Sequence, residues 1–265
     1  KHAIAYKNHP DCNIKSICDF DTSKFSILEK SYPEALFSTD SSLILNDNNI
    51  DVVSIASFDD YHTEQVLQAI SNKKNVMVEK PMCLNIKELL KIKSSIDNNP
   101  EIHLSSNHVL RTNARFRRFK NDINDRKLGE VYYIEADYYW GRIKKLYGWR
   151  SEMDYYSIIL GAAIHVIDLV MWILNSKPKT VHVIGSDIPT KRSNLKYNSF
   201  AVILMTFENG VIAKLTGNGG CIHPHFHGLK IFGSKRTTVH DLFGAYYFDP
   251  HTNDSERVTI KEPYP

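Results

Sequence analysis

The first part of the chain alternates short apolar runs with amphipathic stretches. Residues 13–18 alternate at strand period, and apolar runs that predict buried strands span residues 50–56, 75–78 and 102–110; helical patterns lie between them, as at 63–72. Continuous apolar runs are typical of parallel strands, which are buried on both faces. The pattern therefore predicts an α/β, Rossmann-type doubly wound parallel sheet over residues 1–110.

The pattern changes after residue 110. A helical segment at 115–126 is followed by mostly alternating, strand-like runs at 131–139, 180–186, 200–207, 211–217, 226–232 and 246–249. Glu208-Asn209-Gly210 between two of these runs is a hairpin signal. Residues 111–265 are thus predicted to form an α+β domain with a largely antiparallel open sheet. We expect a homo-oligomer, a dimer or tetramer, to form through this sheet.

Composition excludes several classes of protein. Hydrophobic residues make up 42% of the chain and charged residues 24%, which is ordinary for a soluble globular protein. A net charge of +3 gives no reason to expect nucleic acid as a partner. The four cysteines form no C-x-x-C pair, which favours reduced thiols in a cytoplasmic protein. Residues 155–174 are long and apolar enough to span a bilayer, but a central Asp168 costs about 3 kcal/mol there, so we expect a buried helix and no membrane span.

The first candidate for chemistry is Lys80. It follows the predicted strand at 75–78, which must end near Pro81 because proline has no N–H for the ladder. Ligands of open parallel sheets bind outside the carboxyl ends of the strands. A lysine there can exchange a proton near neutral pH, since desolvation lowers lysine pKa values. The alternative is an ordinary solvated lysine at a strand end.

The second candidate is the pair His165 and Asp168. Three residues apart, they share one helical face, and small residues precede them by one turn. Oxidation of a secondary alcohol requires removal of the hydroxyl proton, for which imidazole is well suited at neutral pH. The alternative is a histidine that is merely buried in the core.

A histidine triplet offers a competing hypothesis. On a strand, His223, His225 and His227 would share a face and could converge on zinc, as in a zinc-dependent enzyme. Pro224 interrupts the ladder, however, and no acidic or cysteine ligand is near in sequence. We therefore predict no metal site and favour a substrate-side or loop-rim cluster.

Val78-Glu79-Lys80-Pro81, preceded by the run at 51–57 and His62 and followed by His165-x-x-Asp168, resembles the glucose-fructose oxidoreductase and inositol dehydrogenase (Gfo/Idh/MocA) family. In that family the lysine lies beside the nicotinamide and the substrate hydroxyl. The resemblance implies hydride transfer to or from a hydroxyl-bearing carbon of a sugar, nucleotide-sugar or cyclitol. His165 would accept the proton and Lys80 would polarise the same oxygen.

The resemblance also implies the remaining site residues. Substrate contacts would come from Asp168, Arg150, Trp149 and Arg111; cofactor contacts would come from Asp19, Ala56, Ser57, Asp59, His62, Glu79, Lys80 and Asn107. An acidic residue after the second strand binds ribose hydroxyls and disfavours a 2′-phosphate, so Asp19 favours NAD over NADP. Alternatively, Asp19 and Asp21 only cap the following helix.

The chain departs from the family at four places. It begins at Lys1-His2-Ala3, which resembles the residues after the glycine loop, so we expect a first strand and loop upstream and further helices after Pro265. Phe58 and Asp59 replace the family's Pro-Asn. Gly161 stands where many members carry an aspartate one turn before the histidine. Because of Gly161, a non-catalytic sugar- or cofactor-binding or regulatory protein on this scaffold remains an alternative.

Overall fold

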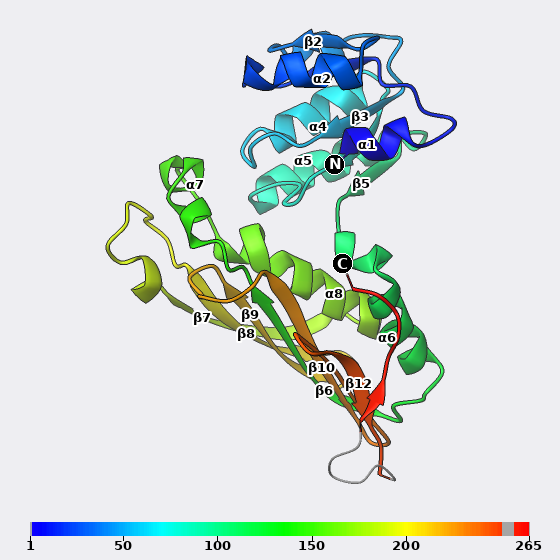
Figure 1. Cartoon of the computed structure of the whole chain (residues 1–265), viewed down its shortest axis with the longest axis vertical. Coiled ribbons are helices and arrows are strands. Elements are labelled where there is room, and N and C mark those ends of the chain that lie inside the picture. Colours follow the sequence, from blue (N-terminus) through cyan, green and yellow to red (C-terminus); the bar gives the residue numbers. More distant parts are fainter. Residues whose placement is uncertain (1, 251–256, 265) are drawn as a thin grey trace. The chain divides into compact units, whose positions relative to one another are not determined.

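A computed structural model describes residues 2–250 and 257–264 (Figure 1). The chain divides into two compact units, residues 1–107 and 108–265, and each is described by itself.

The first unit is built from alternating helices and strands. In chain order they are α1 (His2–Lys7), β1 (Ser16–Cys18), α2 (Phe25–Ser31), β2 (Leu36–Ser38), α3 (Ser42–Leu45), β3 (Val52–Ile55), α4 (His62–Ser71), β4 (Asn75–Val78), α5 (Ile86–Asp97) and β5 (Leu104–Ser106). The strand pairs β1–β2, β3–β4 and β4–β5 are all parallel. This arrangement confirms the predicted Rossmann-type fold.

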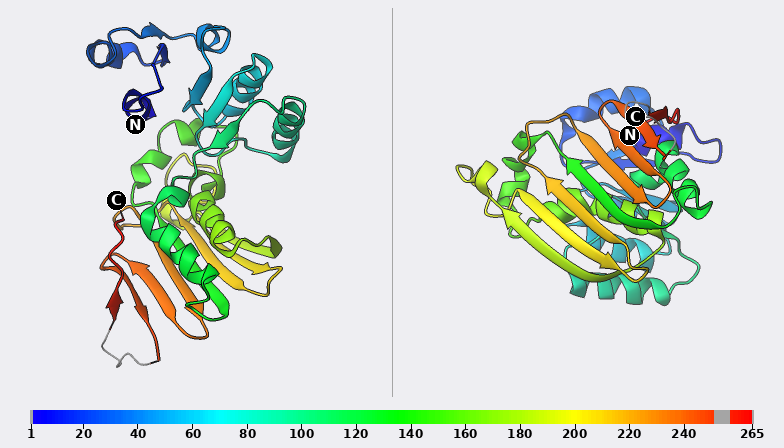
Figure 2. Two further views of the ribbon diagram at one scale, coloured as in Figure 1. Left: turned by 90° about the vertical axis from the view of Figure 1, so that its right-hand side faces the viewer. Right: turned by 90° about the horizontal axis from the view of Figure 1, so that it is seen from below.

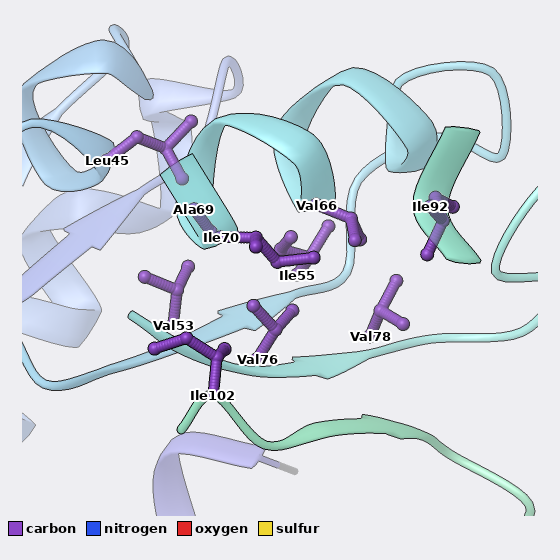
Figure 3. Close-up of a cluster of buried hydrophobic side chains, with 10 residues drawn as sticks. All are labelled: Leu45, Val53, Ile55, Val66, Ala69, Ile70, Val76, Val78, Ile92 and Ile102. Atoms are coloured by element: carbon purple, nitrogen blue, oxygen red, sulfur yellow. The ribbon is translucent and has the colours of Figure 1, made fainter. Parts of the chain in front are cut away.

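The core of the first unit lies between the sheet β3–β4–β5 and the helix α4. Strand residues such as Val53 and Val76 point toward Val66 and Ile70 of α4 (Figure 3). Val66, Ile70 and Val78 are completely buried. Burying each such side chain stabilises the fold by about 1.5–3 kcal/mol, so this packing holds β3 and β4 against α4.

One predicted strand of this unit is wrong in its extent. Residues 102–110 were expected to form one strand, but β5 ends at Ser106 and a 3-10 turn, η2, follows at Val109–Thr112. The last ladder bond runs from Asn107 N to Val78 O, at 2.8 Å. Beyond it β4 itself has ended, so the chain has no neighbouring strand to pair with.

The second unit contains an eight-stranded sheet. Its elements are α6 (Ala114–Asn124), β6 (Val131–Tyr139), α7 (Trp149–Glu152), α8 (Ile164–Leu174), β7 (Pro178–Ser186), β8 (Phe200–Phe207), β9 (Ile212–Asn218), β10 (Phe226–Gly233), β11 (Thr237–Asp241), β12 (Gly244–Phe248) and β13 (Val258–Thr259). The spatial order is β13-β12-β11-β10-β6-β9-β8-β7. Strands β6 and β9 pair in parallel, whereas the other described pairs are antiparallel. The prediction of a largely antiparallel sheet is confirmed, including the hairpin between β8 and β9 at Gly210, whose φ is +85°.

Helix α8 covers one face of this sheet (Figure 2). The side chains beneath it, among them Ile134, Ala213 and Leu215, are fully buried. The opposite face is more exposed, and Ile184 of β7 and Leu204 of β8 lie on it. The sheet thus has one face in the core and one open face.

Within the apolar stretch at 155–174, residues 159–174 form a helix in two parts. A π-helical turn at Ile159–Ala163 continues directly into α8. Across residues 2–250 and 257–264, no helix combines the length and the apolarity needed to cross a bilayer. His165 and seven further residues of the two parts are buried within the second unit.

Candidate active site

Three neighbouring strand ends of the first unit meet at one edge of its sheet. Because β3, β4 and β5 are parallel and β4 lies between the other two, the residues that follow them share this carboxyl edge. Ser57 follows β3, Lys80 follows β4 and Asn107 follows β5. Ligands of doubly wound sheets bind at this edge, and Ser57, Lys80 and Asn107 lie at it; their contacts with a cofactor stay a prediction.

Glu79 joins these strand ends through its carboxylate. Its Oε1 accepts a hydrogen bond from Asn107 Nδ2 at 2.8 Å and lies 3.0 Å from His2 Nε2. The other ring nitrogen of His2 lies 2.8 Å from Ser54 Oγ, at β3. Glu79 and Asn107 thus hold the ends of β4 and β5 together and attach α1 to them. Neither His2 nor Ser54 was among the predicted site residues, although His2-Ala3 resembles the residues after the family's glycine loop.

Lys80 lies half-buried in the turn after β4, and its peptide bond to Pro81 is cis. The next carbonyl, that of Pro81, lies 2.7 Å from Nδ1 of His62, whose side chain is fully buried. Nε2 of the same ring lies 3.2 Å from the carbonyl oxygen of Ser57. His62 was predicted to bind the cofactor; both of its ring nitrogens contact backbone carbonyls of the two adjacent turns.

The two aspartates after β1 have different surroundings. Asp21 caps the 3-10 turn at Thr22–Lys24, because its Oδ1 accepts the backbone N–H of Ser23 at 3.1 Å and its hydroxyl at 2.5 Å. These bonds hold the pKa of Asp21 below its usual value. Asp19 accepts one backbone N–H, from Asp21, at 3.0 Å. The capping interpretation is confirmed for Asp21, and the ribose contact of Asp19 stays a prediction.

The loop after β3 is open on one side. Ala56 and Ser57 are exposed, and Ser57 Oγ donates a hydrogen bond to Gln65 at 2.7 Å. Phe58 contacts the ring of Phe20, with centroids 5.3 Å apart. The loops after β1 and β3 therefore meet through this aromatic pair, which stands beside Asp19 and the half-buried Asp59 in sequence.

In the second unit, His165 lies in the first turn of α8 and is 9% exposed. Its ring packs edge-on against Tyr138, at 5.6 Å between centroids, and against His227, at 5.7 Å. Tyr138 and His227 are paired across β6 and β10 and stack at 4.4 Å. Two rings of the sheet, those of Tyr138 and His227, thus pack against the imidazole of His165. The sequence alone did not predict these contacts.

Two predicted substrate residues bind each other. Asp168 accepts hydrogen bonds from Arg111 Nε at 2.8 Å and from a terminal guanidinium nitrogen at 2.5 Å. His108 Nδ1 lies 3.6 Å from the same carboxylate. This bidentate contact raises the pKa of Arg111 and ties the turn η2 to α8.

Arg150 and Trp149, also predicted to contact substrate, begin the short helix α7. The guanidinium of Arg150 lies 4.1 Å from the ring centroid of Trp149 and 5.4 Å from that of Trp140. Aromatic faces attract a cation, so the two indoles orient this arginine.

The histidine triplet does not form a set of three metal ligands. Strand β10 begins only at Phe226, so His223 and His225 lie in the preceding loop. His225 and His227 pack on Tyr138, whereas His223 packs on Tyr139. Within the described part of the chain, no group of three or more His, Cys, Asp or Glu side chains is arranged to hold a metal ion.

Two family models match the chain, one on each unit. Residues 1–108 match the model described as oxidoreductase family, NAD-binding Rossmann fold, and residues 116–239 match the GFO/IDH/MocA C-terminal domain. The chain belongs to the Gfo/Idh/MocA family. It is therefore an oxidoreductase with an NAD-binding Rossmann domain.

Relatives in this family include enzymes of cyclitols and sugars. Myo-inositol 2-dehydrogenase of Thermotoga maritima is 20% identical over 239 residues, which cover 88% of this chain and 69% of the relative. The 1,5-anhydro-D-fructose reductase of Ensifer adhaerens is 24% identical over 173 residues, which cover 64% of this chain and 51% of the reductase.

A solved Gfo/Idh/MocA-like structure has the same fold. Scyllo-inositol dehydrogenase from Lactobacillus casei, solved with bound NAD(H) and scyllo-inositol, aligns with a TM-score of 0.78 at 17% identity over 97% of this chain and 77% of that one. At this identity the likeness establishes the fold alone.

Gly161, which stands where the family resemblance implies an aspartate, lies against an aromatic ring. A Cβ built at Gly161 would lie 2.7 Å from Cζ of Tyr156 and closer still to its hydroxyl oxygen. Tyr156 is only 2% exposed. The aromatic ring thus fills the space beside the helical turn that precedes His165, so no larger side chain fits at this position without a shift of the ring.

Proposed function

We propose that the chain is an NAD-dependent oxidoreductase that transfers hydride to or from a hydroxyl-bearing carbon of a sugar or cyclitol, with Lys80 and His165 as its catalytic residues. The observation on which this proposal depends is the turn at Glu79-Lys80-Pro81. It follows β4, the central strand of a parallel sheet in an NAD-binding family, and contacts from Asn107 and His62 hold it. The names of the cyclitol and sugar enzymes among its relatives support the substrate class.

The residues at the carboxyl edge fit a dinucleotide. Asp19 offers a carboxylate after β1, and the exposed Ala56 and Ser57 leave the backbone after β3 accessible. Bound NAD supplies the hydride acceptor. We assign cofactor contacts to Asp59, Glu79, Lys80 and Asn107 of this edge as well, whereas the buried His62, predicted from the sequence to bind the cofactor, contacts backbone carbonyls through both ring nitrogens.

The proposed chemistry needs one proton acceptor and one donor of hydrogen bonds. As the C–H bond of the alcohol loses hydride, the hydroxyl proton must leave, and the imidazole of His165 accepts it. The ammonium of Lys80 donates a hydrogen bond to the same oxygen and stabilises the negative charge that develops there. Arg150, Trp149, Arg111 and Asp168 are proposed to surround the substrate.

Replacing Lys80 by Met tests this assignment. We expect Lys80→Met to lower kcat by about 100-fold or more, the usual effect of losing a stabilising group in the transition state, while the Kd for NAD changes little. Turnover is followed by the absorbance of reduced nicotinamide with myo-inositol, scyllo-inositol and 1,5-anhydro-D-fructose. Lys93→Met, an exposed lysine paired with Asp97 on α5, is the matched control. Turnover retained by Lys80→Met would refute its role, and NAD binding without turnover of the wild type on a broad panel would refute the activity.

The preference for NAD depends on Asp19. Its carboxylate would repel a 2′-phosphate, so Asp19→Ser should raise the ratio of kcat/KM with NADP to that with NAD by about tenfold, which corresponds to about 1.4 kcal/mol. Asp21→Ser removes the neighbouring capping carboxylate and should leave this ratio unchanged. Equal ratios in wild type and Asp19→Ser would remove Asp19 from the ribose site.

A further inference from the structure

We propose that His62 is a positioning residue that holds the turn bearing Lys80 in place. The inference rests on the proposed role of Lys80 and adds to it a residue that acts through the backbone. His62 is the first residue of α4, and its side chain is 0% exposed. Burying a polar side chain costs free energy unless the side chain is hydrogen-bonded, and both ring nitrogens of His62 have such contacts.

The two contacts of the ring join the turns after β3 and β4. Nδ1 lies 2.7 Å from the carbonyl oxygen of Pro81, and Nε2 lies 3.2 Å from that of Ser57. A carbonyl can only accept, and a neutral imidazole carries a single N–H. We assign that N–H to Nδ1 on the shorter distance. The bond that His62 donates therefore ends on the residue directly after Lys80.

Two further anchors flank the same turn. On one side, the Glu79 carboxylate accepts the amide of Asn107 at 2.8 Å. On the other side, Glu88 Oε2 accepts the backbone N–H of Leu84 at 2.8 Å and the hydroxyl of Thr63 at 3.0 Å. His62, the first residue of α4, thus contacts the segment between β4 and α5 directly, whereas Thr63 contacts Glu88 of α5, which in turn binds Leu84 of that segment. Lys80 thus lies between hydrogen-bonded residues on both sides. On its carboxyl side the nearest of them is Pro81, whose carbonyl His62 contacts.

The contact from His62 affects the reaction through the position of Lys80. A group that is displaced by about 1 Å from its productive position can lose about 100-fold in rate. Without the bond from His62, the Pro81 carbonyl loses its partner and the turn is free to shift. The loss should appear in kcat, because the contacts that hold the dinucleotide come largely from other residues.

Three substitutions separate the two contacts of the ring. The amide nitrogen of Asn reaches about where Nδ1 of His lies, and that of Gln reaches toward the place of Nε2. His62→Asn should therefore keep the bond to Pro81, His62→Gln should favour Ser57, and His62→Leu should lose both. We expect kcat within about threefold of wild type for His62→Asn, and lower by about tenfold or more for the Gln and Leu variants, with the KM for NAD within about threefold in all three.

A second measurement reports on Lys80 without turnover. The full chain is treated briefly with acetic anhydride, and mass spectrometry gives the acetylation rate of Lys80 relative to Lys93, an exposed lysine on α5. We expect this ratio to change by about threefold or more in His62→Leu and to stay near the wild-type value in His62→Asn.

An unchanged labelling ratio in His62→Leu, or equal kcat values for the Asn and Gln variants, would overturn the proposal. If His62→Leu does not fold, the comparison of Asn with Gln decides in the same way. If Lys80→Met retains turnover, the proposed function fails, whereas the labelling ratio still reports whether His62 fixes this turn.

Discussion

Two buried histidines of the second unit are kept neutral by their surroundings. Burial, with additional repulsion from His225 and from His240, lowers the pKa of His227 to about 3. Burial and the nearby Arg115 lower the pKa of His240 to about 4. Both side chains lie among aromatic rings, including that of Tyr264. An imidazolium in either place would lack the hydration that it has in the unfolded chain.

We therefore expect stability to fall as the pH falls below about 6.5. The unfolded chain binds a proton at each histidine near pH 6.5, whereas folded His227 does so only near pH 3, so protonation favours unfolding between these values. Each such group can contribute up to about 1.4 kcal/mol per pH unit in this window. Urea unfolding at pH 7.5, 6.0 and 5.0 should show a shallower pH dependence for His227→Gln than for wild type. His182→Gln, on the exposed side of β7, should retain the wild-type slope; equal slopes for all three proteins would contradict the burial argument.

The space beside Gly161 gives a second test of a single residue. An added Cβ would meet the ring of Tyr156, so Gly161→Ala should lower the free energy of unfolding by about 1–3 kcal/mol, the usual effect of overpacking a core. Urea unfolding measures the change. Gly148→Ala is the control, because a Cβ there meets no atom within 4 Å. A Gly161→Ala variant as stable as wild type would mean that the Tyr156 ring moves freely.

At this scale the sequence identified residue types better than their partners. The position of Lys80 at a strand end could be predicted from the apolar run and Pro81, because both signals are local. The bond between Arg111 and Asp168 joins residues that are far apart in sequence, and no local pattern predicts such a contact. The contact of His62 with Pro81 could not be predicted either, because these residues are also far apart in sequence.

At the scale of the element, the start of α5 depends on its N-cap residue, Asn85. Asn85 accepts the backbone N–H of Glu88 at 3.0 Å, and its amide donates to Glu88 Oε1 at 2.7 Å. Asn85→Ala should therefore cost about 1 kcal/mol and speed hydrogen exchange in the first turn of α5. Exchange measured by mass spectrometry on peptides covering 84–97 checks this. Lys87→Ala, an exposed residue of the same turn, should have little effect; equal exchange in the two variants would argue against the cap.

Elements with strong apolar periodicity were predicted closely. Strands β6 and β8 have the predicted bounds, since their alternation continues to both ends. Strand β11 (Thr237–Asp241) was missed because its sequence is largely polar; pairing with β10 and β12 makes it a strand. Strand β2 is similarly short and depends on β1. Tertiary pairing thus decided the elements whose own sequences carry weak signals.

At the scale of the whole molecule, the open face of the large sheet is the predicted surface for self-association. Ile184 is 74% exposed, Ile212 50% and Leu204 45%. Charged side chains on β6 and its neighbours are paired, as in Lys230 with Glu135 at 3.2 Å. Apolar side chains beside paired charges are suited to burial in an interface.

Ile184→Asp should therefore shift the protein to a smaller species. Light scattering coupled to gel filtration measures the mass. The matched control is Ile188→Asp, the same change at a residue that is 79% exposed but lies outside the sheet, and it should leave the mass unchanged. An identical mass for wild type and Ile184→Asp would place any interface elsewhere.

The parallel pairing of β6 with β9 has a consequence for synthesis on the ribosome. Strand β6 leaves the ribosome before both of its neighbours, β9 and β10, which are translated only after α8, β7 and β8. Until then its edges carry unpaired backbone groups that can bind other chains. Aggregation during expression should consequently increase with the delay between the synthesis of β6 and that of β9 and β10. Slow translation of residues 140–233 should therefore lower the yield of folded protein more than equal slowing of the residues before β6.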